Sequence, residues 1–329
     1  MKKLPLLRFL ACAAVIPTAA FADPVSEMAS FSVFGKVDLG ELANGQVKTA
    51  AGAPMNTPRY LSVQSCFVIQ KTPAQVVQAM KQFDPAAHRE LKVYLHSDLP
   101  GSPSAANFSK LTNPPGNSAV KALSAATGKM APELQVSRAE AQQFSEGMPV
   151  FDFWTEVLTK RAQDFASGGA RAEPPYDHTS AAVQSGKEIS GLVRQQVQVS
   201  KQFSGFLGAT GLIGGKGSLK PDLYWELLEV EDEGVLTLGA SYTRGTPGGG
   251  YQAADGLYYA SGGYYVALTL YQLWPVEVGD YPSTLVWRGD FISAASLGDL
   301  HGVERIASEG AMKKDISKAV TVFKSEAGR

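Results

Sequence analysis

The stretch from Gly262 to Arg329 constrains the fold most, because it predicts two neighbouring strands followed by one long helix. Residues 264–274 are dense in β-branched and aromatic side chains, which favour strands. After a turn containing proline and glycine, a second strand is predicted over residues 283–292. The apolar period then changes from two to about 3.6, which predicts a helix from about Leu297 to Ser325. We therefore expect a sheet that is closed by a long helix.

The apolar stripe of this closing helix needs a partner surface. The adjacent sheet is the simplest candidate. The stripe consists of Val303, Ile306, Ala307, Met312, Ile316, Val320 and Phe323.

The first 22 residues have the pattern of a secretory signal peptide. Lys2, Lys3 and Arg8 are basic, residues 4–16 form a short apolar run, and the small residues of Ala20-Phe21-Ala22 suit a cleavage site. Cleavage after Ala22 would leave residues 23–329 in the periplasm or secreted. A lipoprotein signal at Cys12 is the alternative.

The mature chain would carry 27 basic and 31 acidic residues, a net charge near −4. This mildly acidic balance argues against nucleic acid or an anionic membrane as a partner. No later run of eighteen apolar residues is present, so no transmembrane segment is expected. Cys66 would be the only cysteine left, and its apolar strand pattern predicts a buried thiol.

The front of the mature chain predicts strand, short helix and strand. Residues 29–42 alternate weakly, which indicates one or two strands, and residues 59–70 form a clearer strand. Thr72-Pro73 is a typical helix start, with a hydroxyl N-cap before proline. Another strand is predicted over residues 91–96.

Residues from about 99 to 221 have a different texture and predict a large helical insertion. Ser137 opens a capping box, Pro149 precedes another helix, and residues 181–206 predict a long one. Sheet-like sequence then resumes. The hairpin of residues 222–230 and 235–243 is followed by a short strand over residues 257–259.

Motifs that would name a reaction are weak or absent. The glycine-rich segment 205–217 lacks the spacing and the Ser/Thr of a phosphate loop, so it predicts a mobile loop at a pocket mouth. Ser118 and Lys121 have the spacing of a serine–lysine pair but no accompanying Lys-Thr-Gly strand. The four histidines are scattered, which argues against a dedicated metal site. No cofactor is expected.

Arg288 and Asp290 stand two apart on one strand, so they share one face of the sheet. They form either a solvated charge pair or, if that face lines a cavity, an anchor for a ligand head group. Aromatic residues gather in the same C-terminal sheet, as a tyrosine-dotted apolar cavity would require. The candidate ligand-binding residues are Tyr94, Trp225, Tyr242, Tyr265, Tyr271, Arg288 and Asp290.

The order of elements resembles the helix-grip fold of the START-like superfamily, which includes lipid-transfer domains and polyketide cyclases. Residues 61–84 and 262–323 carry the resemblance, which lies in topology and not in a residue motif. It implies an α+β domain in which an antiparallel sheet wraps the C-terminal helix around a hydrophobic cavity. The insertion of roughly 120 residues departs from that pattern, and no catalytic residue can be carried over.

These observations leave three hypotheses for function. The first is an exported, non-enzymatic protein that binds a hydrophobic small molecule or lipid between sheet and helix. The second is an exported cyclase, lyase or hydrolase that uses an acid–base pair in the cavity, such as Asp290 with a tyrosine, and it requires an enclosed carboxylate with a perturbed pKa. The third is an envelope scaffold whose insertion docks a partner through an exposed apolar patch.

Overall fold

The computed structural model describes residues 23–179 and 181–328, so the signal peptide predicted for residues 1–22 lies outside the described residues. The chain has the expected α+β fold, built on one eight-stranded antiparallel sheet in the order β1-β2-β8-β7-β6-β5-β4-β3. The strands are β1 (Lys48–Ala51), β2 (Tyr60–Ile69), β3 (Val93–Leu99), β4 (Asp222–Val230), β5 (Glu233–Gly245), β6 (Tyr251–Ala260), β7 (Val266–Val278) and β8 (Tyr281–Ser293).

Helices precede the sheet, interrupt it and close it. The α-helices are α1 (Pro24–Phe31), α2 (Leu39–Ala43), α3 (Pro73–Gln82), α4 (Ser118–Gly128), α5 (Arg138–Ala141), α6 (Val150–Gly168), α7 (Ser185–Gln195), α8 (Val197–Leu207), α9 (Ala295–Gly298) and α10 (Gly302–Ala327). Short 3-10 helices are η1 (Pro85–Ala87), η2 (Arg89–Leu91), η3 (Ala105–Thr112) and η4 (Gly169–Arg171). Helices α4 to α8 lie between β3 and β4, which confirms the helical insertion.

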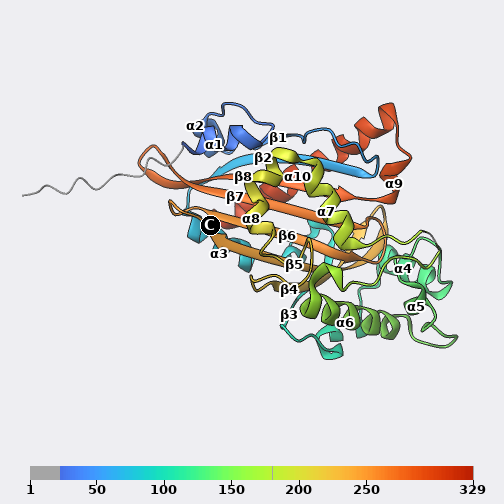
Figure 1. Cartoon of the computed structure of the whole chain (residues 1–329). Helices are drawn as coiled ribbons and strands as arrows, with labels where there is room; N and C mark the ends of the chain where they lie inside the picture. The colour runs from blue at the N-terminus through green and yellow to red at the C-terminus, as the bar shows by residue number, and fades with distance from the viewer. Residues whose placement is uncertain (1–22, 180, 329) are drawn as a thin grey trace, which may run out of the picture.

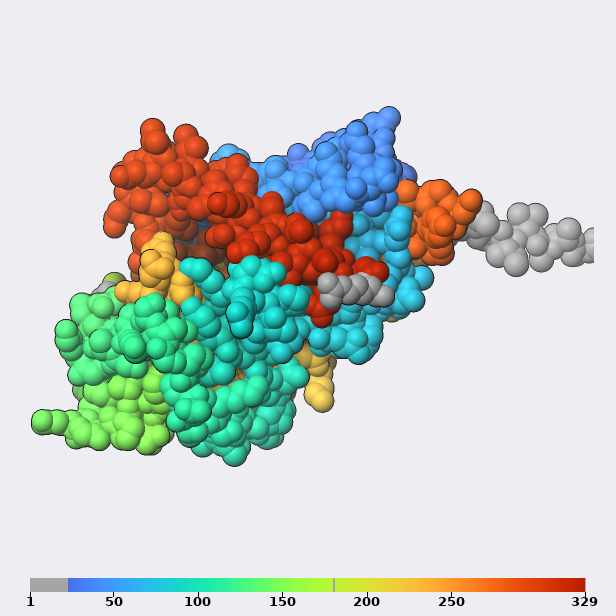
Figure 2. Space-filling view, turned by 180° about the vertical axis from the view of Figure 1, so that it is seen from behind, coloured from blue at the N-terminus to red at the C-terminus, as the bar shows by residue number. Residues whose placement is uncertain are grey.

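The two faces of the sheet are covered by different helices. The helices α1, α2, α7 and α8 lie over one face, with α6 beside β3 and β4, while α3 and α10 lie behind it (Figure 1). Seen from behind, α10 crosses the molecule between the N-terminal segments and the segments that follow β2 and β3 (Figure 2). The insertion therefore packs on the face opposite α10.

The insertion face carries the main hydrophobic core. Trp287 of β8 contacts Phe31 of α1 at 5.0 Å and Phe203 of α8 at 5.6 Å between ring centroids. Phe165 of α6 stacks on Tyr258 of β6 at 3.7 Å. Aromatic contacts of this kind add to the burial of apolar surface that holds the insertion on the sheet.

A buried ion cluster fastens the insertion internally. The Arg161 guanidinium in α6 is fully buried, donates to Glu140 at 2.6 Å and to Glu173 at 3.4 Å, and lies 4.3 Å from the Tyr259 ring centroid. Two carboxylates share one guanidinium, and burial raises the pKa of Glu173 to about 8 against the opposing effect of Arg161. Glu173 is therefore protonated at neutral pH.

The closing helix buries its apolar stripe against the sheet along its C-terminal part. Ile316 and Val320 of α10 are buried against the β2 residues Val63 and Phe67. The start of the predicted stripe has no such partner, since Val303 is 81% and Ile306 71% exposed. The sequence pattern alone could not show where the sheet ends beneath the helix.

Several predicted boundaries were wrong, each for a local reason. Residues 29–42 contain the end of α1 and most of α2, because Asp23 and Asp38 cap helices there by accepting from Ser26 N and Glu41 N. Residues 181–206 form two helices, broken at Gln196, whose side chain donates to the Ala53 carbonyl at 2.7 Å.

The C-terminal elements also differ in extent from the prediction. The short strand over residues 257–259 is part of the ten-residue β6. The closing helix begins at Gly302, whose φ of +53° separates it from α9.

Candidate functional site

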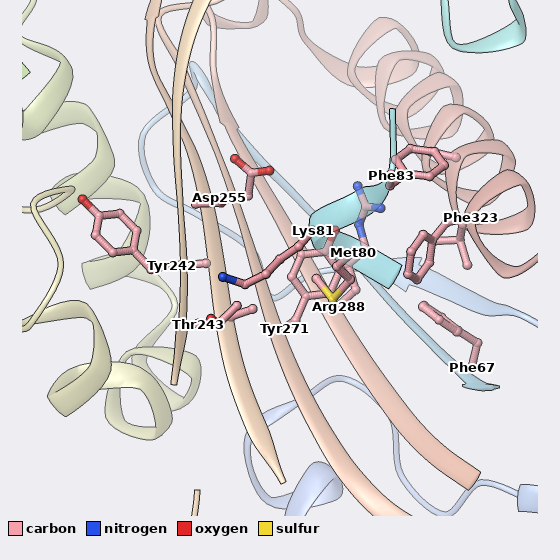
Figure 3. A pocket seen from close by; sticks show the side chains of 15 residues that line it. Phe67, Met80, Lys81, Phe83, Tyr242, Thr243, Asp255, Tyr271, Arg288 and Phe323 are labelled. Atoms are coloured by element: carbon pink, nitrogen blue, oxygen red, sulfur yellow. The ribbon is translucent and has the colours of Figure 1, made fainter. Parts of the chain in front are cut away.

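A cavity runs between the sheet and the two helices α3 and α10. It consists of three adjoining pockets of about 670, 660 and 170 Å³, and all three border on Arg288 of β8 and Ala319 of α10. The smallest pocket reaches from β6 to the ring of Phe67 on β2 (Figure 3). Loops at the two ends of the insertion, residues 100–101 and 220–221, line one rim.

The helix side of the 170 Å³ pocket is mostly apolar, whereas Ser308, Asp315 and Lys318 of α10 line the 660 Å³ pocket. Met80 and Phe83 come from α3 and its C-cap, while Val320 and Phe323 come from α10. Phe83 and Phe323 meet edge to face, with ring centroids 5.6 Å apart. Figure 3 shows these rings gathered with Phe67 at one end of the pocket. A hydrophobic body would find apolar contacts there.

On the sheet side, alternate residues of each strand face the helices, and in the 170 and 670 Å³ pockets many of these residues are polar. The sheet side of the 660 Å³ pocket is largely apolar, with Leu61, Leu228 and Ile292. Tyr271 pairs with Arg288 across β7 and β8, and Asp255 pairs with Ser241 across β5 and β6. His96 pairs with Glu226 across β3 and β4. The strand register therefore brings one polar row across the cavity floor.

Arg288 and Asp290 form a tight pair on this floor. The Arg288 Nε and Nη2 atoms donate to the Asp290 carboxylate at 2.7–3.0 Å, and the Thr269 hydroxyl donates to it at 3.0 Å. Burial opposes the charge of Arg288, but Asp290 and Tyr271 outweigh it and raise the pKa of Arg288. Arg288 therefore stays charged, and both carboxylate oxygens of Asp290 accept hydrogen bonds from it.

Asp255 has a different environment. Its Oδ1 atom accepts from the Tyr224 hydroxyl at 2.6 Å. The Tyr224 ring crosses β5 at Gly239, where a β-carbon would lie 2.1 Å from the ring, so only glycine leaves room for this bond. Burial, assisted by the charge of Glu226, raises the pKa of Asp255 to about 6 against the opposing hydrogen bond from Tyr224.

His96 and Glu226 form the third polar pair of the floor. The His96 Nδ1 atom lies 3.1 Å from the Glu226 carboxylate. Burial lowers the pKa of His96, but the hydrogen bond and charge of Glu226 outweigh burial, so the pKa is raised. His96 also lines the 670 Å³ pocket.

The predicted site residues divide between the two faces. Tyr271, Arg288 and Asp290 lie together on the cavity side. Trp225 is fully buried on the insertion face, where its Nε1 atom donates to the Asn107 carbonyl at 3.1 Å. Alternation along each strand decides this division, and the sequence did not show which face the cavity would occupy.

The other three predicted tyrosines lie away from the cavity floor. The Tyr242 hydroxyl accepts from Gly211 N at 3.1 Å, and Figure 3 shows its ring pointing away from the pocket. Tyr265 stacks on Tyr176, with ring centroids 6.1 Å apart. Tyr94 sits at the edge strand β3, where its hydroxyl bonds with Glu229.

The candidate set lacked Asp255, Tyr224, Glu226 and His96. Asp255 precedes the short strand that was predicted at residues 257–259, so no face was assigned to it. The alternation of β4, with Leu223, Trp225 and Leu227 apolar, does place Tyr224 and Glu226 on the opposite face. That signal was present in the sequence.

Other candidate chemistry finds less support. Within residues 23–179 and 181–328, no group of three or more metal-ligating side chains is present. Cys66 is buried, and burial raises the pKa of its thiol to about 12. Gly211 and Gly214 of the glycine-rich segment accept from backbone amides of η4 at 2.8 and 3.0 Å, beside a separate pocket of about 300 Å³. Among the described helices, none is long and apolar enough to cross a membrane.

Comparison with known proteins found no matching family model, no similar curated protein and no similar solved structure. The cavity itself is therefore the basis for a functional proposal.

Proposed function

We propose that this protein binds an amphipathic small molecule or lipid in the cavity between the sheet and α10. The observation that carries the proposal is an apolar wall from α3 and α10 that faces polar residues of the sheet around the 170 and 670 Å³ pockets. The adjoining 660 Å³ pocket adds a largely apolar stretch of the sheet. A hydrophobic body would gain affinity by burial against Phe67, Phe83 and Phe323. The polar floor would orient a head group.

The topology supports this proposal through the helix-grip resemblance. Strand β2 is followed by α3 and β3, and strands β4 to β8 form one meander that returns to pair with β2 before α10. This is the order that the START-like superfamily implies, with α1, α2 and β1 added in front and the insertion placed between β3 and β4. The insertion covers the opposite face, so it leaves the space under α10 unfilled.

Export belongs to the same proposal. The N-terminal signal pattern favours a periplasmic or secreted protein that carries or sequesters its ligand outside the cytoplasm.

Native mass spectrometry of the protein purified from its natural compartment tests the proposal. We expect a bound mass that organic extraction releases. Ala319→Phe should abolish this mass by filling the point where the three pockets meet. Ala307→Phe is the matched control, because Ala307 is exposed on the same helix. Equal ligand content in both variants, or none in the wild type, would contradict the proposal.

An acid–base enzyme is the second candidate, and Asp255 is the observation that favours it. Both oxygens of Asp290 accept from Arg288, but Asp255 is a half-buried carboxylate whose pKa of about 6 suits proton transfer near neutral pH. Tyr224 touches it and His96 lies on the same floor. A hydrolase or lyase would use Asp255 as the base and Tyr224 or His96 as the acid.

Turnover of 4-nitrophenyl esters of graded chain length tests this second candidate. Asp255→Asn should lower kcat/KM by about 100-fold or more, the usual contribution of a general base. The rate should rise with pH through about 6, as Asp255 ionises. Turnover that survives Asp255→Asn would exclude this assignment.

The scaffold hypothesis has less support. Among the described residues of the insertion, only Val197 is an exposed large hydrophobic side chain. A single exposed valine does not make a docking patch of several hundred Å².

A further inference from the structure

The cavity floor has one carboxylate without a basic partner, and this selects a ligand class. Arg288 pairs with Asp290 at 2.7 Å, Lys81 with Asp222 at 2.8 Å, and His96 with Glu226 at 3.1 Å. Arg288, Lys81 and His96 are thus each matched by a carboxylate. Lys220 also lines the 670 Å³ pocket, but its side chain is exposed and forms no ion pair with a described residue. Among the described residues, Asp255 receives only the neutral Tyr224 hydroxyl, at its Oδ1 atom.

The second carboxylate oxygen of Asp255, Oδ2, has no hydrogen-bond donor among the described residues. The side chain borders both the 670 and the 170 Å³ pockets. A carboxylate in such a site costs free energy unless a cation or donor approaches it. The charge of Glu226 on the neighbouring strand adds to this cost.

The geometry points to an amphipathic amine as the ligand, with its protonated amino group beside Asp255 and its apolar body against the phenylalanine wall of α3 and α10. This inference rests on the proposed binding function and specifies its ligand. An ammonium group would supply the missing positive charge and up to three donors. A carboxylate ligand would instead be repelled, because Arg288 is already neutralised by Asp290.

The groups around Asp255 also set a pH dependence. The titratable or charged side chains that line the pocket around Asp255 come from β3, β4, β7, β8, α3 and the loop before β4. They are His96, Asp98, Asp222, Tyr224, Glu226, Tyr271, Arg288, Lys81 and Lys220. Asp255 loses its charge as the pH falls through about 6. An aliphatic amine stays protonated over this range, so its affinity should decline below pH 6. The affinity of a neutral alcohol should change little.

Isothermal titration with decylamine, decanol and decanoate at pH 7.5 and pH 5 tests the inference. Decylamine should bind the wild-type protein at least about tenfold more tightly than decanol at pH 7.5, the factor expected for one charge-assisted hydrogen bond. Decanoate should bind more weakly than decanol. The preference for the amine should shrink at pH 5.

Two variants separate the role of the charge from the role of the fold. Asp255→Asn keeps an acceptor for Tyr224 but removes the charge, so the amine preference should disappear while decanol still binds. Asp98→Asn is the matched control, since Asp98 borders the same pocket but its side chain is 95% exposed and faces solvent. Tyr224→Phe should retain the preference, because the carboxylate remains.

The outcomes distinguish the two proposals. If decanol binds and Ala319→Phe blocks it, but decylamine has no advantage or keeps its advantage in Asp255→Asn, the amine inference is wrong and the binding function stands. If none of the three compounds binds, both are wrong.

Discussion

At the scale of single residues, the cavity floor shows how a buried charge is tolerated. The Arg288 guanidinium meets the Asp290 carboxylate through two of its nitrogens, and Thr269 adds a third donor. Such a pair gives little net stability over an apolar alternative, but breaking it leaves one uncompensated charge. Its value lies in holding both side chains in fixed positions beneath α10.

Asp290→Asn should therefore destabilise the protein by about 3 kcal/mol, measured by urea unfolding at pH 7. Asp222→Asn is the control, because its pair with Lys81 is solvent-exposed and worth less than about 1 kcal/mol. Equal effects of the two substitutions would show that the Arg288–Asp290 pair is not desolvated.

At the scale of elements, α10 has two parts with different roles. Its C-terminal part packs apolar side chains on the sheet. Its first turns leave Val303 and Ile306 exposed and contact β2 through Arg305, which donates to the Tyr60 carbonyl. The same apolar stripe thus runs through a packed and an unpacked region. Contact with the strands, and not the helical pattern, decides which part stabilises the fold.

Val320→Ala should cost about 2 kcal/mol of unfolding free energy, because Val320 is only 1% exposed in the core between α10 and β2. The same substitution at Val303, which is 81% exposed, should change stability by less than about 0.5 kcal/mol. Thermal or urea unfolding of the two variants measures the difference. A comparable loss from Val303→Ala would mean that the first turns of α10 are covered in solution.

The sequence predicted elements well where the hydrophobic period and the helix-capping residues indicate the same element. It predicted them poorly where a short capped helix has the alternating pattern of a strand. Thr72 and Gln75 form the expected capping box of α3, and the strand–turn–strand–helix order at the C-terminus is confirmed. Asp23 and Asp38 cap α1 and α2, but the weak alternation over residues 29–42 concealed them.

The candidate site was predictable only in part. The spacing of Arg288 and Asp290 placed them on one face, and the structure puts that face on the cavity. Trp225 and Tyr242 were predicted to bind ligand because of their side-chain chemistry. In the structure their side chains lie on the insertion face of the sheet. Asp255 is identified as a site residue only by its strand pairing with Ser241 and by the Tyr224 ring that passes over Gly239. Contacts between strands that are distant in the chain cannot be obtained from spacing alone.

At the scale of the whole molecule, buried carboxylates make the stability depend on pH. The folded-state pKa of Glu173 is raised to about 8 from an ordinary value of 4.5. The folded state therefore binds more protons than the unfolded chain between these values. Stability from this group is full below pH 4.5 and is lost as the pH rises toward 8.

Glu173→Gln mimics the protonated side chain, so it should stabilise the protein relative to the wild type by about 2–4 kcal/mol at pH 8. The two proteins should converge near pH 4. Urea unfolding at pH 4, 6 and 8 measures this difference. Glu156→Gln, at an exposed position of α6, should show no such pH-dependent gain. A wild type that is more stable than Glu173→Gln at pH 8 would refute the assignment of a protonated Glu173.

The cavity beneath α10 is free for a ligand. The floor residues line it, α10 packs on the sheet beside it, and the insertion lies on the opposite face. A crystal structure of the protein with decylamine tests this claim most directly. We expect the ligand between the sheet and α10, with its chain beside Ala319 and its nitrogen within hydrogen-bond distance of Asp255. A ligand bound beneath the insertion helices, or side chains filling the space under α10, would contradict it.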